Sequence, residues 1–201
     1  MDYLIYFLTV SLCVTVVYMG IRYFLIDTIA ISGYSMFPNY NNYQDPDKQD
    51  TIQIDLLSPR FGDYRRGEVV VLRTPATCDV SQSLIIKRVI GIPGDKIIFD
   101  NGKVLVQVSK TDDLPVILDE VSYLSAEVPT FKNVISLQDR YEEPILGKDE
   151  YFVMGDNRIK SKDSRYCGKI DKDLILGREV FRLQPSDKRG FFNTPKYNIG
   201  N

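Results

Sequence analysis

Two residues in this sequence have the types and neighbours of a catalytic nucleophile and its base. Ser35 lies within residues 33–38, between a Gly-Tyr pair and a Met-Phe-Pro sequence, and both flanks favour bends of the backbone. Lys87 lies in a β-branched run, where the alternation of side chains places it on one face with Ile85 and Val89. A lysine between apolar side chains is poorly hydrated, which lowers its pKa and lets the neutral amine accept a proton. Lys87 is equally compatible with an edge strand, where a charged side chain opposes aggregation.

The absence of histidine restricts the chemistry that these residues could perform. It excludes Ser-His-Asp and Cys-His catalytic arrangements and every His-ligated metal site. A hydrolytic nucleophile in this chain would need a lysine, a carboxylate or the N-terminal amine as its base. The net charge of −2 gives no basic field, so nucleic acid is not an expected partner. We expect neither a metal ion nor another cofactor.

The three cysteines are too few for a disulfide-rich fold. Cys13 lies in an apolar segment and is most simply a small packing residue. Cys78 and Cys167 lie in the charged part of the chain and could pair if that part is outside the cell. The sequence does not show whether their Cα atoms come close enough, so their pairing is left open.

The element in front of Ser35 is an uncharged segment at residues 3–21, in which fifteen of nineteen side chains are apolar. As a helix rising ~1.5 Å per residue it would be roughly 28 Å long, close to the hydrocarbon thickness of a bilayer. A cleaved secretory signal fits less well, because Asp2 stands where Lys or Arg is usual and the apolar run exceeds ~7–15 residues. We therefore expect a retained membrane anchor at residues 1–27. Arg22, on its C-terminal flank, leaves the orientation open.

Beyond residue 40 the sequence predicts a mostly β domain, because no long stretch has helical periodicity. Residues 69–72 are apolar at every position, which predicts a strand buried on both faces. Asn101-Gly102, between two apolar runs, predicts a two-residue hairpin turn. The domain is expected to span residues 28–190, with an irregular surface insertion at 109–149 and a fraying tail at 191–201. Strands are expected at residues 51–56, 69–72, 84–90, 96–99, 103–108, 150–154 and 176–183.

A second group of polar residues follows the strand expected at 150–154 and lies within residues 155–165. The simplest interpretation is a solvated loop, because loops rich in charge usually face water. A more specific one is a support for the base, in which Asp163 and Arg165 form a charge-assisted pair. Ser161 could then donate a hydrogen bond to the Lys87 amine and direct it toward the nucleophile.

Four motifs in this chain resemble, in the same order, those of the type I signal peptidase (leader peptidase) family. They are residues 33–38, 66–71 and 87–95, and then residues 155–158 followed by Ser161, Asp163, Ser164 and Arg165. The family consists of membrane-anchored Ser/Lys endopeptidases that remove N-terminal signal peptides from exported preproteins. Four motifs in order are a specific signal, although they cover only about a seventh of the residues.

The resemblance implies a role for each motif residue. Ser35 would attack the scissile carbonyl, and Lys87 would take its proton and later deliver it to the leaving amine. Ser161 would orient Lys87, while Asp163 and Arg165 would hold the segment that carries Ser161. The backbone N–H of Ser35 would supply one donor of the oxyanion hole, a contribution typically of ~3–4 kcal/mol.

The resemblance also implies the fold, the location and the substrate. The domain would be a mostly antiparallel β structure on the extracytoplasmic side of the cell membrane, anchored by one transmembrane helix and resting on the lipid bilayer. Its substrate would be an extended peptide with small side chains before the cut, bound by strand addition. Some members place a serine hydroxyl two residues before the nucleophile, where this chain has Gly33, so the second oxyanion donor stays unassigned.

Three departures from the family's motifs accompany the resemblance. Asn39 stands where Thr is usual, Glu68 stands where Asp is usual, and residues 39–50 replace a Gly-Asp pair. We interpret these departures as an altered substrate preference, such as a restricted set of secreted or surface proteins.

Other functions are compatible with parts of this pattern. A catalytically idle assembly or binding factor could have the same fold, but it would not need both Ser35 and Lys87. A self-cleaving Ser/Lys repressor would need a DNA-binding helical domain where this chain has the apolar segment. An organellar inner-membrane peptidase is not excluded by the sequence.

Overall fold

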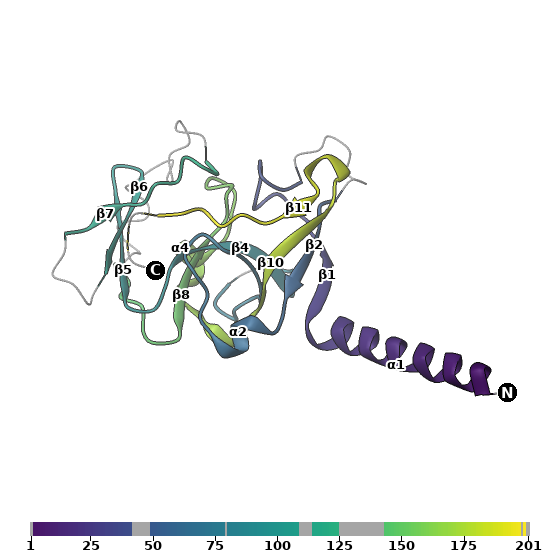
Figure 1. Cartoon of the computed structure of the whole chain (residues 1–201). Coiled ribbons are helices and arrows are strands. Elements are labelled where there is room, and N and C mark those ends of the chain that lie inside the picture. The colour runs from purple at the N-terminus through teal and green to yellow at the C-terminus, as the bar shows by residue number, and fades with distance from the viewer. Residues whose placement is uncertain are drawn as a thin grey trace.

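The computed structural model of the chain consists of one N-terminal helix followed by a domain of antiparallel strands (Figure 1). It describes residues 2–41, 49–78, 80–108, 114–124, 143–197 and 199. The elements are, in chain order, α1 (Asp2–Phe24), β1 (Ile26–Ala30), β2 (Thr51–Asp55), α2 (Ser58–Phe61), β3 (Val69–Arg73), β4 (Leu84–Gly91), β5 (Asp95–Asp100), β6 (Lys103–Val108), β7 (Val116–Ile117), β8 (Glu150–Met154), α4 (Ser164–Cys167), β9 (Ile170–Asp171), η1 (Lys172–Leu174), β10 (Ile175–Gln184), η2 (Ser186–Lys188) and β11 (Gly190–Phe191).

The strands form two antiparallel sheets. The larger sheet has eight strands, seven of them in the order β1-β2-β10-β3-β4-β8-β9, and β11 pairs with β10 beside this path. The smaller sheet has three strands in the order β5-β6-β7. The prediction of a mostly β, antiparallel fold with one N-terminal apolar helix is therefore confirmed.

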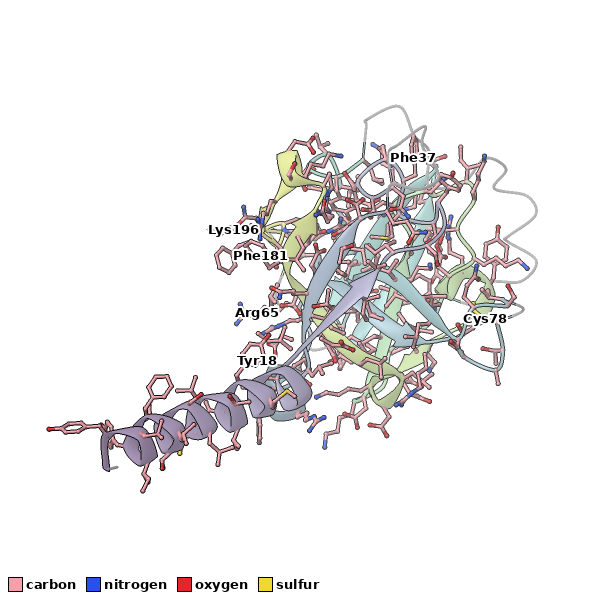
Figure 2. The ribbon with its side chains drawn as sticks, turned by 90° about the vertical axis from the view of Figure 1, so that its right-hand side faces the viewer. Tyr18, Phe37, Arg65, Cys78, Phe181 and Lys196 are labelled. Carbon is pink, nitrogen blue, oxygen red and sulfur yellow. A yellow bond between two sulfur atoms is a disulfide. The ribbon has the colours of Figure 1, made fainter. Side chains whose placement is uncertain are left out.

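Helix α1 extends away from the β domain, and its side chains from Tyr3 to Met19 are exposed (Figure 2). Its segment Tyr3–Gly20 is long and apolar enough to cross a membrane by length and composition. The anchor was predicted to extend to residue 27, whereas the helix ends at Phe24 and β1 begins at Ile26. The first strand thus follows the helix almost directly.

Strand β4, which carries Lys87, is an interior strand. It pairs with β3 through residues 84–88 and with β8 through Arg88, Val89 and Gly91. The alternative of an edge-strand lysine is therefore wrong. Strand β3 beside it is buried on both faces as predicted, since Val69 and Val71 pack in a different apolar cluster from Val70 and Leu72.

The hairpin predicted at Asn101-Gly102 is present between β5 and β6. Both turn residues have positive φ, 47° at Asn101 and 76° at Gly102, as a two-residue hairpin turn requires. The stretch at 109–149, predicted to be irregular, contains a short strand at its described part, because β7 pairs with β6. Residues 109–113 and 125–142 lie outside the described residues.

The C-terminal tail does not fray as predicted over its described residues. Strand β11 pairs with β10, and Tyr197 is buried in the same apolar cluster as Val104 and Phe152. The Tyr197 hydroxyl donates a hydrogen bond of 3.1 Å to the hydroxyl of Tyr123. Burial of this large aromatic side chain is what holds the tail against the domain.

Candidate active site

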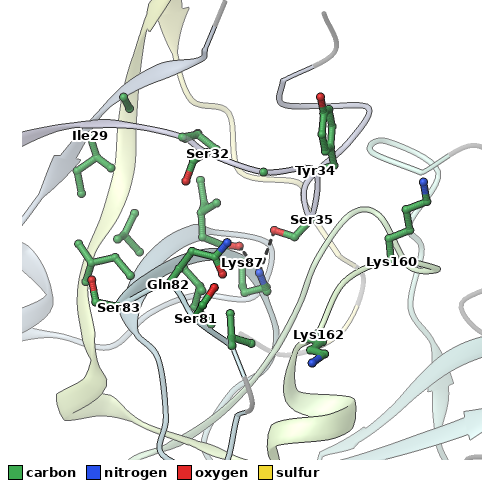
Figure 3. Close-up of a pocket in the computed structure, with 18 residues that line it drawn as sticks. Ile29, Ser32, Tyr34, Ser35, Ser81, Gln82, Ser83, Lys87, Lys160 and Lys162 are labelled. Carbon is green, nitrogen blue, oxygen red and sulfur yellow. Dashed lines mark hydrogen bonds between the residues drawn. The ribbon is translucent and has the colours of Figure 1, made fainter. Parts of the chain in front are cut away.

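Ser35 and Lys87 meet at the floor of a surface groove (Figure 3). The Lys87 Nζ lies 2.9 Å from the Ser35 Oγ and 2.9 Å from the carbonyl oxygen of Ile86. The two residues are 52 positions apart in the sequence, and β4 presents the amine to the loop that carries the hydroxyl. This distance allows direct proton transfer between the hydroxyl and the amine.

The Lys87 amine is buried, with a relative exposure of 2 % for the residue. Burial lowers its pKa from the ordinary 10.5 to about 8, although the negative charges of Asp163 and Asp156 oppose this shift. A substantial fraction of Lys87 is therefore neutral near physiological pH. The neutral amine can accept the hydrogen of the Ser35 hydroxyl, whereas the ammonium form can only donate to the Oγ.

The loop after β8 holds the backbone around Ser35. The backbone N–H of Asn157 donates to the carbonyl oxygen of Ser35 at 2.9 Å, and the Asn157 Nδ2 donates to that of Tyr34 at 3.0 Å. The backbone of Gly155 packs directly against that of Ser35. A Cβ at position 155 would be 2.3 Å from the Ser35 carbonyl oxygen. Only glycine lets the two segments approach in this way.

Asp163 and Arg165 form a buried, bidentate ion pair behind this loop. The Arg165 Nε and Nη2 each donate to one Asp163 oxygen at 2.8 Å, and the Gly155 N–H donates to Asp163 Oδ2 at 2.9 Å. Arg165 also donates to the carbonyl oxygen of Arg158 at 2.7 Å. Burial would raise the pKa of Asp163, but Arg165 and the Gly155 N–H hold it below its ordinary value. The predicted pair is thus formed, and it fixes the segment from residue 155 to 165.

Ser161 is brought into the site but does not contact Lys87 as predicted. Its hydroxyl is buried and forms no hydrogen bond with Lys87, while its contact with the Asp163 carboxylate helps to lower the pKa of that group. Lys87 instead contacts the Ile86 carbonyl oxygen and Ser35. The Ser161 Oγ would lie 2.2 Å from a Cβ at Gly155, so it borders the segment that holds Ser35.

The two walls of the groove come from different parts of the chain. Its volume is about 870 Å³, and it is lined by residues 29–35 on one wall and by residues 80–87 on the other, with Val71, Lys160 and Lys162 completing it. Figure 3 shows Ser81, Gln82 and Ser83 on one side of the Ser35–Lys87 pair and the two lysines on the other. None of the residues that line the groove is acidic.

Cys78 and Cys167 form a disulfide, which answers the question that the sequence left open. Their Cα atoms are 4.7 Å apart, although 89 positions separate them in the sequence. Cys13 is the free cysteine of the described residues and is exposed on α1. Across the described part of the chain, no three His, Cys, Asp or Glu side chains are grouped so that they could hold a metal ion.

Comparison with known proteins assigns the chain to a family. Residues 4–184 match the sequence profile of the family described as "Signal peptidase, peptidase S26". The chain belongs to the signal peptidase family.

Individual signal peptidases extend this similarity. Signal peptidase IB of Staphylococcus aureus is 30% identical over 178 residues, which are 88% of this chain and 84% of that protein. The probable signal peptidase I-2 of Synechocystis sp. is 30% identical over 173 residues, covering 85% and 69% of the two chains. A crystal structure of a signal peptidase I from Enterococcus faecalis aligns with a TM-score of 0.42 at 20% identity, over 58% of this chain and 97% of that one.

Asn39 and Glu68, which depart from the signal peptidase motifs, are not among the residues that line the groove. The Asn39 Nδ2 donates to Asp156 Oδ2 and to the carbonyl oxygen of Tyr123, both at 2.8 Å. Glu68 accepts hydrogen bonds from the Arg65 N–H and from Arg178. Since both side chains bind other parts of the domain, they do not support the altered substrate preference that we inferred from them.

Asp156 is the centre of the contacts that include Asn39. Its two oxygens accept hydrogen bonds from Arg88 Nε at 2.8 Å and Nη2 at 2.7 Å, and both residues are buried. The Arg88 guanidinium also lies 4.2 Å from the ring centre of Tyr123. Arg88 follows Lys87 in β4, so this ion pair ties the strand of the base to the loop that holds Ser35.

Asn41 and Asp50 position the groove wall of this signal peptidase, and neither was predicted from the sequence. The Asn41 Nδ2 donates to the carbonyl oxygens of Ile31 at 2.8 Å and Gly33 at 2.9 Å. The Asp50 N–H in turn donates to the Asn41 Oδ1 at 2.9 Å, and the Ile31 N–H donates to the Asp50 carbonyl oxygen at 2.8 Å. Asn41 and Asp50, which belong to the stretch that replaces the Gly-Asp pair, therefore support the groove wall. No spacing or periodicity in the sequence indicates these contacts.

Gly33 has a conformational reason to be glycine. Its φ is +87°, in the region that side chains with a Cβ rarely adopt, and its carbonyl oxygen accepts from Asn41. A serine at this position would therefore be strained, although a Cβ would meet no atom within 4 Å. The positive φ that the backbone adopts before Ser35 therefore explains why residue 33 is glycine and not serine.

Proposed function

We propose that this chain is a membrane-bound serine endopeptidase that removes N-terminal signal peptides from exported preproteins with a Ser35–Lys87 dyad. The observation that carries the proposal is the 2.9 Å contact between the Ser35 Oγ and a buried Lys87 amine. Membership of the signal peptidase family supports the same reaction. No base other than Lys87 is needed.

The neutral Lys87 amine would take the proton of Ser35 as the Oγ attacks the scissile carbonyl carbon. The resulting ammonium would then give that proton to the nitrogen of the leaving peptide, which breaks the C–N bond and leaves an acyl group on Ser35. A water molecule activated by the same amine would attack the ester and release the signal peptide. The low pKa of Lys87 suits both directions of transfer, because the amine accepts and releases a proton near pH 8.

The Ser35 N–H would stabilise the oxyanion that forms at the attacked carbonyl. Ser161 would orient the Lys87 amine, since its buried hydroxyl borders the segment that holds Ser35 and would accept from the ammonium once it forms. Asp163 and Arg165 would act through Ser161 as positioning residues. Their buried pair keeps the segment of Ser161 in place as charge moves in the site.

The substrate would bind as an extended strand in the groove. Strand β1 is at the edge of the larger sheet, and β8 pairs with β4 only from Arg88 onward, so within the described residues Leu84–Lys87 has one unpaired edge. These two edges line opposite walls of the groove. Backbone groups along them can pair with a peptide that enters between the walls, as in other strand-addition complexes. Small side chains before the cut would let that peptide reach Ser35.

Helix α1 would anchor the enzyme in the cell membrane as a single span, with the β domain on the extracytoplasmic side. The apolar segment Tyr3–Gly20 has the length to cross the bilayer. The Cys78–Cys167 disulfide supports this side independently, because such bonds persist mainly in oxidising compartments. The preprotein and the active site would then meet at the outer surface of the same lipid bilayer.

A preprotein cleavage assay tests the proposed function. The full chain in detergent micelles is expected to cut a preprotein once, after a small side chain, and mass spectrometry of both products would locate the cut. Ser35→Ala should leave the preprotein intact, because it removes the attacking oxygen. Depletion of the protein from its own cells should make the same preproteins accumulate. Cleavage by Ser35→Ala at the wild-type rate would contradict the proposal.

The pH dependence of cleavage should report the state of Lys87. Only the neutral amine can act as the base, and its population falls about tenfold for each pH unit below the pKa. We therefore expect kcat/KM to rise with pH and to level off above about pH 8, the pKa of Lys87. The measurement is a profile of kcat/KM with a substrate that has no titrating group near the cut. A profile that is level from about pH 5 to 9 would exclude Lys87 as the base.

A further inference from the structure

One wall of the groove belongs to a loop whose described residues, 74–78 and 80–83, form no strand pair with the rest of the sheet. Residues 74–83 connect β3 to β4, and Val80, Ser81, Gln82 and Ser83 line the groove. The loop folds on itself, with the Thr74 N–H donating to the Ser83 carbonyl oxygen at 3.0 Å. Such contacts fix the shape of the loop but not its position relative to the opposite wall.

Two bonds connect the described residues of this loop to α4. One is the disulfide from Cys78 to Cys167, and the other is a hydrogen bond of 2.7 Å from the Thr77 hydroxyl to the Cys167 carbonyl oxygen. Cys78 is half-buried and Cys167 is buried, with a relative exposure of 6 %. Cys78 is two residues before Val80, so the covalent bond is adjacent to the groove wall.

Helix α4 is in turn fixed to the segment of residues 155–165 that borders Ser35. It begins after Asp163, whose side chain accepts the Arg165 N–H, and the Cys167 N–H donates to the Asp163 carbonyl oxygen at 2.9 Å. The Val153 N–H donates to the Ser164 Oγ at 3.0 Å, which ties the helix to β8. The disulfide therefore joins the groove wall to the segment that borders Ser35 and Lys87.

We infer that the Cys78–Cys167 disulfide is a positioning device of the active site, which holds the groove wall at residues 80–83 against α4 so that a peptide substrate meets an ordered groove. The inference rests on the proposed function of the groove as the peptide site. A disulfide that served only the global fold would stabilise the folded chain without a specific effect on peptide binding. The two roles differ in how reduction changes KM and kcat.

Reduction of this disulfide proceeds by thiol–disulfide exchange. A dithiol such as dithiothreitol supplies two electrons and two protons, the sulfur–sulfur bond breaks, and two cysteine thiols form while the reagent becomes a cyclic disulfide. The Thr77 hydrogen bond to the Cys167 carbonyl oxygen then still connects the loop to α4. A peptide that binds the reduced enzyme must order the loop itself, and this ordering weakens binding.

The test compares oxidised and reduced enzyme in a Cys13→Ser background, which removes the free thiol of α1. Alkylation and mass spectrometry would establish that both remaining thiols are free after reduction. We expect KM for a peptide with small side chains before the cut to rise roughly tenfold on reduction, because the loop is no longer ordered in advance. We expect kcat to change less than about threefold, because Ser35 and Lys87 do not move with the loop. Reoxidation should restore KM.

The double variant Cys78→Ser/Cys167→Ser, in the same background, is expected to show the KM of the reduced enzyme and no response to dithiothreitol. An unchanged KM in fully reduced enzyme would overturn the inference. So would a joint loss of kcat and of the near-ultraviolet circular dichroism of the tyrosines, since the bond would then hold the whole fold.

A binding measurement separates this inference from the proposed function. An oxidised enzyme that cleaves no peptide would overturn the function alone. Fluorescence anisotropy of a labelled peptide on Ser35→Ala, oxidised and reduced, would then decide the inference through Kd. A roughly tenfold weaker Kd on reduction would support it, and an equal Kd would overturn it.

Discussion

Lys87→Met is expected to lower kcat/KM for preprotein cleavage by roughly 10⁴-fold, the upper end of what a general base contributes. Methionine has a similar length and can pack in the same apolar surroundings, but it has no nitrogen to accept the Ser35 proton. Lys87→Arg should be equally inactive, because a guanidinium stays protonated at every accessible pH. The measurement is the rate of product formation from a preprotein in detergent micelles.

Two further variants show that the loss belongs to the dyad. Lys188→Met changes an exposed lysine in η2, outside the groove, and should keep the wild-type rate within about threefold. The double variant Ser35→Ala/Lys87→Met should lose no more activity than either single variant, because residues that act as one unit are not additive. A Lys87→Met enzyme that still cleaves within tenfold of the wild type would show that another group takes the proton.

The stability of Lys87→Met provides an internal control. Burial lowers the pKa of Lys87 from 10.5 to about 8, so the folded chain binds this proton less tightly than the unfolded chain. Folding is therefore penalised on the order of 3 kcal/mol below pH 8, and the penalty disappears as the pH rises from 8 to 10.5. Methionine removes the penalty, so Tm at pH 7 should not fall. Lost activity with an unchanged or higher Tm would locate the defect in the chemistry.

The strands could be predicted because their signals are local, whereas the pairing of Ser35 with Lys87 was predicted from the resemblance of four ordered motifs. Continuous β-branched runs and the Asn101-Gly102 turn determine where β3, β4 and the β5–β6 hairpin form. The alternation of side chains along β4 also predicts which face Lys87 occupies. The absence of histidine restricts the base of Ser35 to a lysine, a carboxylate or the N-terminal amine. Each of these inferences needs only a short window of sequence or its composition.

The contacts that position the dyad could not be predicted, because they depend on long-range packing. Nothing in the sequence around Asn41 shows that its amide reaches the carbonyl oxygens of Ile31 and Gly33. The pairing of Cys78 with Cys167 needs the position of α4 beside the groove loop. The missing contact between Ser161 and Lys87 is of the same kind, since distances below about 3 Å decide it. Sequence spacing identifies the members of the site and the local Asp163–Arg165 pair, but not the contacts between segments that lie far apart in the chain.

Gly155 is the position at which this packing can be tested with the smallest change. A Cβ there would lie 2.3 Å from the carbonyl oxygen of Ser35 and 2.2 Å from the Ser161 Oγ. The serine side chain can rotate, but the Ser35 oxygen belongs to the backbone and also accepts the Asn157 N–H. Relief of the overlap must therefore move the peptide unit that carries the nucleophile.

Gly155→Ala is expected to lower kcat/KM by about 100-fold, because a displacement near 1 Å at a reacting group has an effect of this size. Gly190→Ala is the matched control, since a Cβ at Gly190 in β11 meets no atom within 4 Å and its φ is not positive. The control should keep the wild-type rate. Circular dichroism and Tm would separate a displaced nucleophile from an unfolded domain, because a displaced nucleophile lowers kcat while the domain stays folded. A folded Gly155→Ala enzyme with a rate within twofold of the control would show that the Ser35 loop can move away from β8 without loss of catalysis.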